Sequence, residues 1–157
     1  MESRPAARGR GSTGGVLALD YGEKKCGFAV ADALRITRAP LAPLRHEGDE
    51  AILVAHLEGL LAERTISVLV VGLPLNRDGS AGPRARATRA FLERLRARLP
   101  ALDIREWDEH LTTKEAESRL RELGRDGRAI RAERDSWSAL VLLEDWLRSC
   151  PEGTGTP

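Results

Sequence analysis

Short apolar runs alternate with longer amphipathic stretches along most of this chain. The runs that predict strands are residues 15–20, 25–32, 36–44, 67–74 and 102–108. A tight turn at Gly22 separates the first two runs, so we expect them to pair as an antiparallel hairpin. The prolines of the third run favour an edge strand, and the continuous β-branched run that follows it is typical of a central parallel strand.

Apolar residues at helical spacing predict helices over residues 49–63, 83–99, 112–123 and 135–148. The inward face of the first helix is expected to consist of Ile52, Leu53, Leu57, Leu60 and Leu61. The segment 124–133 is basic and contains glycines, which predicts a loop before the last helix. A hairpin followed by alternating strands and helices indicates an α/β domain with a mixed sheet.

The composition indicates one globular domain. The chain has 157 residues, 41% of them hydrophobic and 31% charged, which is enough for a sizeable core. We expect the domain to span 14–149, with disordered polar tails at 1–13 and 150–157. No apolar run approaches the ~20 residues of a membrane helix. The N-terminus lacks a signal-peptide pattern, and Cys26 and Cys150 form no metal-binding spacing, so we expect a cytoplasmic protein that does not contact membranes.

The net charge of +1 gives no overall attraction to nucleic acid, but the charges are unevenly distributed. Arginine-rich segments at 81–100 and 119–134 flank an acidic segment at 101–118. This pattern suits a protein that holds a polyanion and keeps its carboxylates for another purpose. The alternative is that these charges simply cover solvated helix faces.

Acidic residues stand where predicted elements end or begin: Asp20, the pair Asp108 and Glu109, and Asp135. Ligands of α/β sheets collect at the carboxyl ends of strands, and carboxylates gathered there favour a divalent cation that offsets their repulsion. Two such ions can support cleavage of a phosphodiester bond. Spacing alone leaves other roles open. Asp20 could be a turn residue, Asp108 or Glu109 could be solvated, and Asp135 could cap a helix.

Four segments resemble one known family in order and context: "LALDYGEKKCGFAVAD", "VVGLPLNRDGSAGP", "WDEHLTTKEAE" and "RDSWSALVLLEDWL". Over residues 14–148 the chain resembles the YqgF/RuvX proteins, a ribonuclease-H-like group described as Holliday junction resolvases or pre-16S rRNA nucleases. The resemblance implies a five-stranded mixed sheet with helices on both faces. It also implies that Asp20, Glu109 and Asp135 form the catalytic set and bind Mg²⁺ or Mn²⁺, as two ions. Asp108 remains an alternative to Glu109.

The resemblance extends to residues around the acidic set. Asp78 and Ser80 match a loop of the family, and Thr112 and Thr113 match its threonine pair, so these four are expected to support the site. Thr112 to Glu115 also fits a helix capping box. The family commonly has Arg where this chain has His110, which leaves the phosphate-binding role of that position open. The residues expected to contact phosphates are Lys24, Lys25, Arg84, Arg86, Arg125, Arg128 and Arg131.

The sequence therefore predicts a metal-dependent nuclease that acts on structured nucleic acid. We expect it to process the 5′ end of the 16S rRNA precursor, in contact with ribosomal assembly components. Resolution of four-way DNA junctions is an alternative that requires a homodimer, because it needs two symmetric cuts, whereas RNA trimming suits a monomer too. A third alternative, of another class, is a non-catalytic nucleic-acid-binding module. An actin-like ATPase is disfavoured, because the chain is short for a second lobe and has no second hairpin of this kind.

Overall fold

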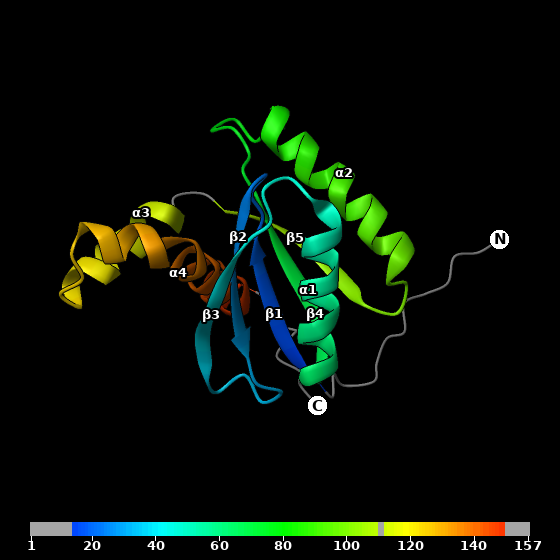
Figure 1. Ribbon diagram of the computed structural model, residues 1–157, viewed down its shortest axis with the longest axis horizontal. Helices are drawn as coiled ribbons and strands as arrows, with labels where there is room; N and C mark the ends of the chain where they lie inside the picture. The colour runs from blue at the N-terminus through cyan, green and yellow to red at the C-terminus, as the bar shows by residue number, and fades with distance from the viewer. Residues whose placement is uncertain (1–13, 110–111, 150–157) are drawn as a thin grey trace.

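The structure is a computed structural model that describes residues 14–109 and 112–149. Within these residues five strands form one sheet in the order β3-β2-β1-β4-β5 (Figure 1). The strands are β1 (Gly15–Asp20), β2 (Lys25–Ala31), β3 (Arg38–Arg45), β4 (Ile66–Leu73) and β5 (Asp103–Asp108). β1 and β2 pair antiparallel, as do β2 and β3, whereas β1, β4 and β5 are parallel. The predicted mixed sheet is confirmed, with the proline-containing strand at its edge.

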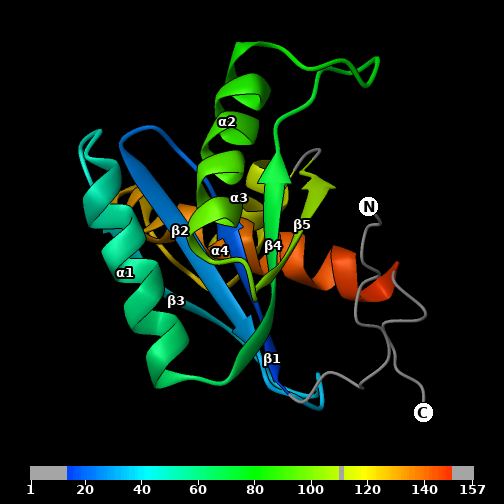
Figure 2. The ribbon, with the colours of Figure 1, turned by 90° about the vertical axis from the view of Figure 1, so that its right-hand side faces the viewer.

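Helices cover both faces of this sheet. α1 (Glu50–Glu63) and α2 (Pro83–Arg98) lie on one face, and α4 (Gly127–Arg148) crosses the other (Figures 1 and 2). α3 (Thr112–Glu122) packs against α4 rather than against the sheet. The first half of α4 and the neighbouring α3 project past the edge of the sheet (Figure 1).

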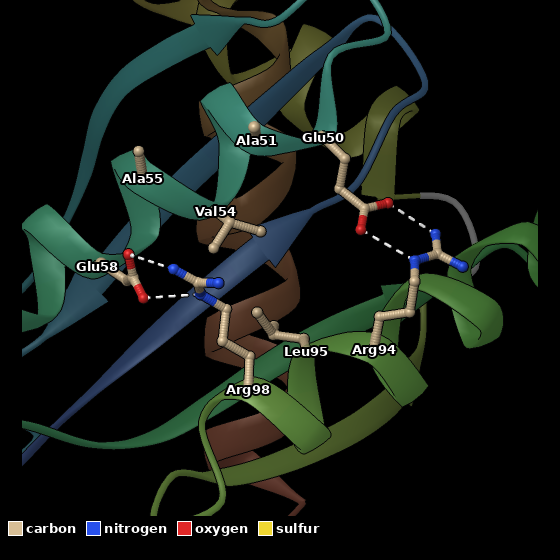
Figure 3. Close-up of a pocket in the computed structure, with 8 residues that line it drawn as sticks. All are labelled: Glu50, Ala51, Val54, Ala55, Glu58, Arg94, Leu95 and Arg98. Carbon is tan, nitrogen blue, oxygen red and sulfur yellow. Dashed lines mark hydrogen bonds and ion pairs between the residues drawn. The ribbon is translucent and has the colours of Figure 1, made fainter.

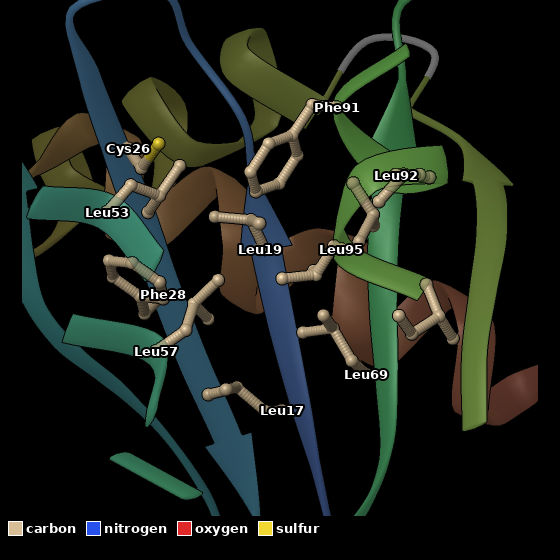
Figure 4. Packing of buried hydrophobic residues seen from close by; sticks show 12 residues of the cluster. Leu17, Leu19, Cys26, Phe28, Leu53, Leu57, Leu69, Phe91, Leu92 and Leu95 are labelled. Carbon is tan, nitrogen blue, oxygen red and sulfur yellow. The ribbon is translucent and has the colours of Figure 1, made fainter. Parts of the chain in front are cut away.

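The two-residue period of the strands divides the core into two layers. Leu17 and Leu19 point toward α1 and α2, where they meet large side chains such as Phe91 (Figure 4). Ala18 and its partner Ala29 point toward α4. Because the residues on that face of β1 and β2 are small, α4 can lie close to the strands that it crosses.

Two details of the helix predictions are wrong. Ile52 was expected to face inward, but its side chain is 45% exposed, and Leu53 and Leu57 are the buried residues of α1. The segment 124–133 was expected to be a loop, but α4 begins at Gly127. The carboxylate of Asp126 caps this helix by accepting a hydrogen bond from the Ala129 N–H at 2.8 Å. The turn that the glycines predict therefore ends where the capped helix begins. The alanines, arginines and glutamate that follow favour a helix.

The predicted tails at 1–13 and 150–157, including Cys150, lie outside the described residues, so the domain limits stay a prediction. Among the helices of the described ranges, none is long and apolar enough to span a bilayer.

Candidate active site

Asp20 is the last residue of β1 and lies half-buried on the face of the sheet that α4 covers. Glycines flank it on both neighbouring strands. Gly27 on β2 is its register partner, and on β4 Gly72 follows Val71, the partner of Leu19. A Cβ at Gly27 would collide with the backbone of Asp135, and a Cβ at Gly72 would collide with the carboxylate of Glu109. Each glycine thus leaves room for another acidic residue to approach Asp20.

Glu109 follows the last residue of β5, and its N–H donates to the Leu73 carbonyl oxygen at 3.1 Å, which continues the pairing with β4. Its side chain lies over Gly72, on the same face as Asp20, and the two carboxyl groups share a hydrogen bond. Asp108 is exposed, and the alternation of the strand points it to the opposite face. The structure therefore brings Glu109, and not Asp108, to Asp20.

Burial makes both carboxyl groups costly to ionise. Burial raises the pKa of Asp20 well above its usual value, and the charge of Glu109, the hydrogen bond to it and the charge of Asp135 raise it further. Burial also raises the pKa of Glu109, while its hydrogen bond with Asp20 and the positive charge of Arg84 oppose the rise. Their hydrogen bond raises the pKa of Asp20 and lowers that of Glu109, so Asp20 is the partner that holds a proton more readily and would donate it to Glu109.

Asp20→Asn is expected to stabilise the ion-free protein. Because the pKa of Asp20 is raised in the folded state, the folded protein binds this proton more tightly than the unfolded chain, and stability falls as the pH rises through that range. The neutral amide removes this loss. In EDTA the variant should melt a few degrees above wild type at pH 8, and the difference should vanish toward pH ~4.

Asp78→Asn is the matched control for that comparison. Hydrogen bonds from Ser80 hold the pKa of Asp78 below its usual value, so this substitution is not expected to raise the melting temperature at pH 8. Equal melting temperatures of wild type and Asp20→Asn at pH 8 would contradict the assignment of Asp20 as a proton-sharing group.

Asp135 lies about two turns into α4 rather than at its N-cap, and its backbone rests on Gly27. Its side chain does not join the carboxyl pair directly. Oδ2 of Asp135 is 3.3 Å from Nζ of Lys25, and the charge of Asp135 acts on Asp20 at longer range. Among the described residues, no group of three or more Asp, Glu, His or Cys side chains is arranged as a metal site. The structure thus brings Asp20 and Glu109 together, with Asp135 beside them in an ion pair.

Ser136 fixes the position of α4 on the sheet. Its Oγ accepts a buried hydrogen bond of 3.2 Å from the Phe28 N–H, next to the irregularity where the pairing of β2 with β3 shifts register. Further along the same helix face, Ala139, Leu142 and Trp146 are buried against the sheet. Asp135 is therefore held at the carboxyl edge of β1 by its own neighbour.

Ser136→Ala is expected to destabilise the protein by about 1–2 kcal/mol, because it leaves the buried Phe28 N–H without its acceptor. Ser138 offers a matched control on the same helix. Its Oγ is buried and has no hydrogen-bond partner among the described residues, so Ser138→Ala should be neutral or slightly stabilising. Urea unfolding of both variants measures the difference. Equal effects would mean that the hydrogen bond does not hold the helix.

The donor set fits a hard divalent cation. Asp20 and Glu109 supply carboxylate oxygens at a half-buried position, and Gly72 keeps the space above β4 free of a side chain. Mg²⁺ and Mn²⁺ prefer such ligands, and a cation can replace the proton that the pair shares. Asp135 offers a third carboxylate on the neighbouring helix.

Three of the predicted basic residues lie on α2 and in the turn that follows β1. Arg84, exposed in the first turn of α2, lowers the pKa of both Asp20 and Glu109, which places its charge within reach of both. Arg86, on the same turn, donates to the Ala81 carbonyl oxygen at 3.0 Å. Lys24 is exposed in the turn that follows Asp20.

The other predicted arginines lie in the first turns of α4 and in the connection that precedes it. Arg125 is paired with Glu133 at 3.0 Å. Arg128 and Arg131 are exposed, and within the described ranges neither forms an ion pair. Whether these residues contact phosphates stays a prediction.

Two aromatic side chains that sequence reasoning did not assign to the site hold its framework. His46 is buried, accepts from the Gly48 N–H through Nδ1, and therefore donates from Nε2 to the Gly22 carbonyl oxygen at 2.9 Å. Tyr21 stacks on Phe91 of α2 at a centroid distance of 4.7 Å. Together they tie the turn after Asp20 to the start of α1 and to α2. No local pattern marks such a long-range tether.

The loop between β4 and α2 is organised by its own side chains. The N–H and Oγ of Ser80 donate to Oδ1 of Asp78 at 2.9 and 2.6 Å, and Asn76 donates to Oγ of Ser80 at 2.9 Å. Gly79 adopts a positive φ of 87° that few other residues tolerate. Figure 2 shows the connection between β4 and α2 beyond the end of β4. Asp78 and Ser80 bond to each other, and their support of the site stays a prediction.

Two further predictions concern the threonine pair and its surroundings. Thr112 and Thr113 begin α3, and Thr113 is exposed. His110 and the side chain of Thr112 lie outside the described residues. The capping box, which depends on that side chain, therefore stays a prediction.

A groove of about 420 Å³ lies on the opposite face, between α1 and α2 (Figure 3). Two ion pairs, each with two hydrogen bonds, cross this groove. Glu50 accepts from Arg94 at 2.6 and 2.9 Å, and Glu58 accepts from Arg98 at 2.9 and 3.5 Å. These charged groups pair with each other and join α1 to α2. The groove therefore differs from the site at the carboxyl pair, where acidic groups lie side by side.

The strand order and the strand directions are those of the ribonuclease-H-like class of α/β folds. Comparison with known families agrees with this class. Residues 14–149 match the family model RuvX, described as Holliday junction resolvase. The chain therefore belongs to the RuvX family.

Individual relatives point the same way, each under the name "Putative pre-16S rRNA nuclease". A protein of Anaeromyxobacter sp. (strain Fw109-5) is 46% identical over 131 residues, which cover 83% of this chain and 94% of that protein. One of Chloroflexus aurantiacus (strain ATCC 29366 / DSM 635 / J-10-fl) is 38% identical over 133 residues, or 84% and 85% of the two chains. One of Paracoccus denitrificans (strain Pd 1222) is 46% identical over 121 residues, or 77% and 75%.

Proposed function

We propose that this protein is a metal-dependent nuclease that trims the 5′ end of the 16S rRNA precursor in the cytoplasm. The observation that carries the proposal is the pair of Asp20 and Glu109, which share a hydrogen bond over Gly72. Two carboxyl groups with raised pKa values at the carboxyl ends of parallel strands are costly to keep unless they serve chemistry. Cation binding is the chemistry that their oxygen donors fit best.

In the proposed mechanism Asp20, Glu109 and Asp135 are the residues that would hold the cation. A divalent cation, when bound, stabilises negative charge on the scissile phosphate and lowers the pKa of the attacking water. The proton shared by Asp20 and Glu109 must leave first, so activity should fall as the pH drops through the raised pKa values. Arg84 orients the phosphate next to the pair, and the other basic residues bind the flanking backbone.

The names of the relatives support precursor RNA as the substrate. The description of the family model supports four-way DNA as a second candidate. The two differ in assembly, because a junction resolvase must make two symmetric cuts and so needs a dimer with paired sites, whereas RNA trimming does not. We favour the RNA substrate, with ribosomal assembly components as the accompanying partners.

The test compares wild type with Asp20→Asn on two substrates, a ribosomal precursor RNA and a four-way DNA junction. Each is incubated with Mg²⁺, with Mn²⁺ or with EDTA. The proposal expects metal-dependent product from the RNA with wild type, none with the variant, and similar RNA affinity of both proteins. Product from the junction alone would select the second candidate. Equal product from both proteins would refute the role of Asp20.

A further inference from the structure

Lys25 opens β2 beside the carboxyl pair and forms an ion pair inside the proposed site. Its Nζ lies 3.3 Å from Oδ2 of Asp135, and the two side chains are 36% and 21% exposed. Lys25 precedes Gly27 by two residues on the same strand, so both face α4. Gly27 lets the backbone of Asp135 rest on β2. The ammonium group of Lys25 therefore reaches the carboxylate of Asp135 from the neighbouring position on the same face of this strand.

The three acidic residues have two different kinds of partner. Asp20 and Glu109 are hydrogen-bonded to each other, whereas the charge of Asp135 is met by the ammonium group of Lys25. An ammonium group and a divalent cation on one carboxylate repel each other because both are positively charged. The ammonium group of Lys25 lies on Oδ2 of Asp135, so a cation that binds this carboxylate is opposed by Lys25 and displaces it where the cation takes Oδ2.

We propose that Lys25 is an internal counter-ion that holds Asp135 while the site is free of metal and competes with a divalent cation for its carboxylate. The inference rests on the proposed function, because it takes Asp135 as a metal ligand. Lys25 is then a positioning residue, and it sets the metal concentration at which the site becomes complete. Removal of its charge should make metal binding tighter, even though the fold loses an ion pair.

Lys24 is the matched control. It is exposed one residue earlier, and among the described residues it forms no ion pair with an acidic group. Lys24→Met removes the same charge at nearly the same place, so it accounts for the general electrostatic effect of a lost lysine on cation binding. Lys25→Arg keeps the charge and should bind metal like wild type.

Isothermal titration with Mn²⁺ in the absence of nucleic acid tests the proposal, after thermal melting has shown that each variant is folded. Lys25→Met is expected to bind Mn²⁺ about fivefold more tightly than Lys24→Met, which is the scale of a partly exposed ion pair. Equal or weaker binding by Lys25→Met, with clear binding by wild type, would overturn the role of Lys25 alone. Failure of wild type to bind Mn²⁺ would overturn both this inference and the metal dependence beneath it.

Discussion

Glu109→Gln is expected to reduce the cleavage rate by about 10³-fold or more, the scale seen when one member of a catalytic unit is lost. The amide has the same size, so it can still lie over Gly72, but it lacks the negative charge that draws a cation to Asp20. Binding of the RNA should persist, because the basic residues are untouched. Initial cleavage rates at saturating Mg²⁺, with RNA affinity measured in EDTA, separate the two effects.

Asp108→Asn is the control for this experiment, because it makes the same change one residue earlier. Asp108 is exposed, and its charge reaches the site only by raising the pKa of Glu109. Its loss should leave the rate near that of wild type at neutral pH and move the acidic limb of the pH profile slightly lower. A variant of Asp108 as inactive as Glu109→Gln would show that both carboxylates take part.

Gly72→Ala should lower the cleavage rate about a hundredfold, the cost of displacing a catalytic group by roughly 1 Å. The three heavy atoms nearest to the added Cβ all belong to the side chain of Glu109, so the glutamate must leave its place beside Asp20. The backbone of β4 needs no change, and the loss of stability should stay within about 1–3 kcal/mol. Cleavage assays and urea unfolding on the same preparation measure both quantities.

A double-mutant cycle tests whether the collision with Glu109 is the cause. In a Glu109→Ala background the carboxylate is gone and the Cβ of residue 109, 3.0 Å from the added Cβ, is the contact that remains, so the stability cost of Gly72→Ala should fall. Gly59→Ala serves as a second control, since nothing lies within 4 Å of a Cβ there and the position is inside α1. That change should stabilise by up to about 1 kcal/mol without loss of activity. An unchanged cost of Gly72→Ala in the Glu109→Ala background would refute the proposed contact.

Particular residues show how far sequence reasoning reached. The run at 67–74 predicted a central parallel strand, and β4 pairs with β1 and β5 on its two sides. The choice between Asp108 and Glu109 stayed open, because the alternation of a strand is uncertain at its last residue. The pairing of Glu109 with Leu73 resolves it. The start of α4 was misjudged because glycines signal a turn, and the cap by Asp126 lies between them.

Asp135 illustrates what periodicity can and cannot convey. The stripe that it shares with Ala139 and Leu142 predicted a helix face turned toward the sheet, and those residues are buried there. The same stripe gave no sign of Lys25 as the partner of Asp135, because that contact joins residues from opposite ends of the chain.

The sequence by itself determined the strands, most of the helices and the presence of acidic residues at their ends, because these depend on local periods of apolar side chains. Only the tertiary structure decided which carboxylates meet. Register places Gly27 and Gly72 beside Asp20, and the space left by their missing side chains admits α4 and Glu109. Such contacts depend on the missing side chain of a glycine that is distant in sequence. The periodicity of apolar residues along the chain gives no sign of them.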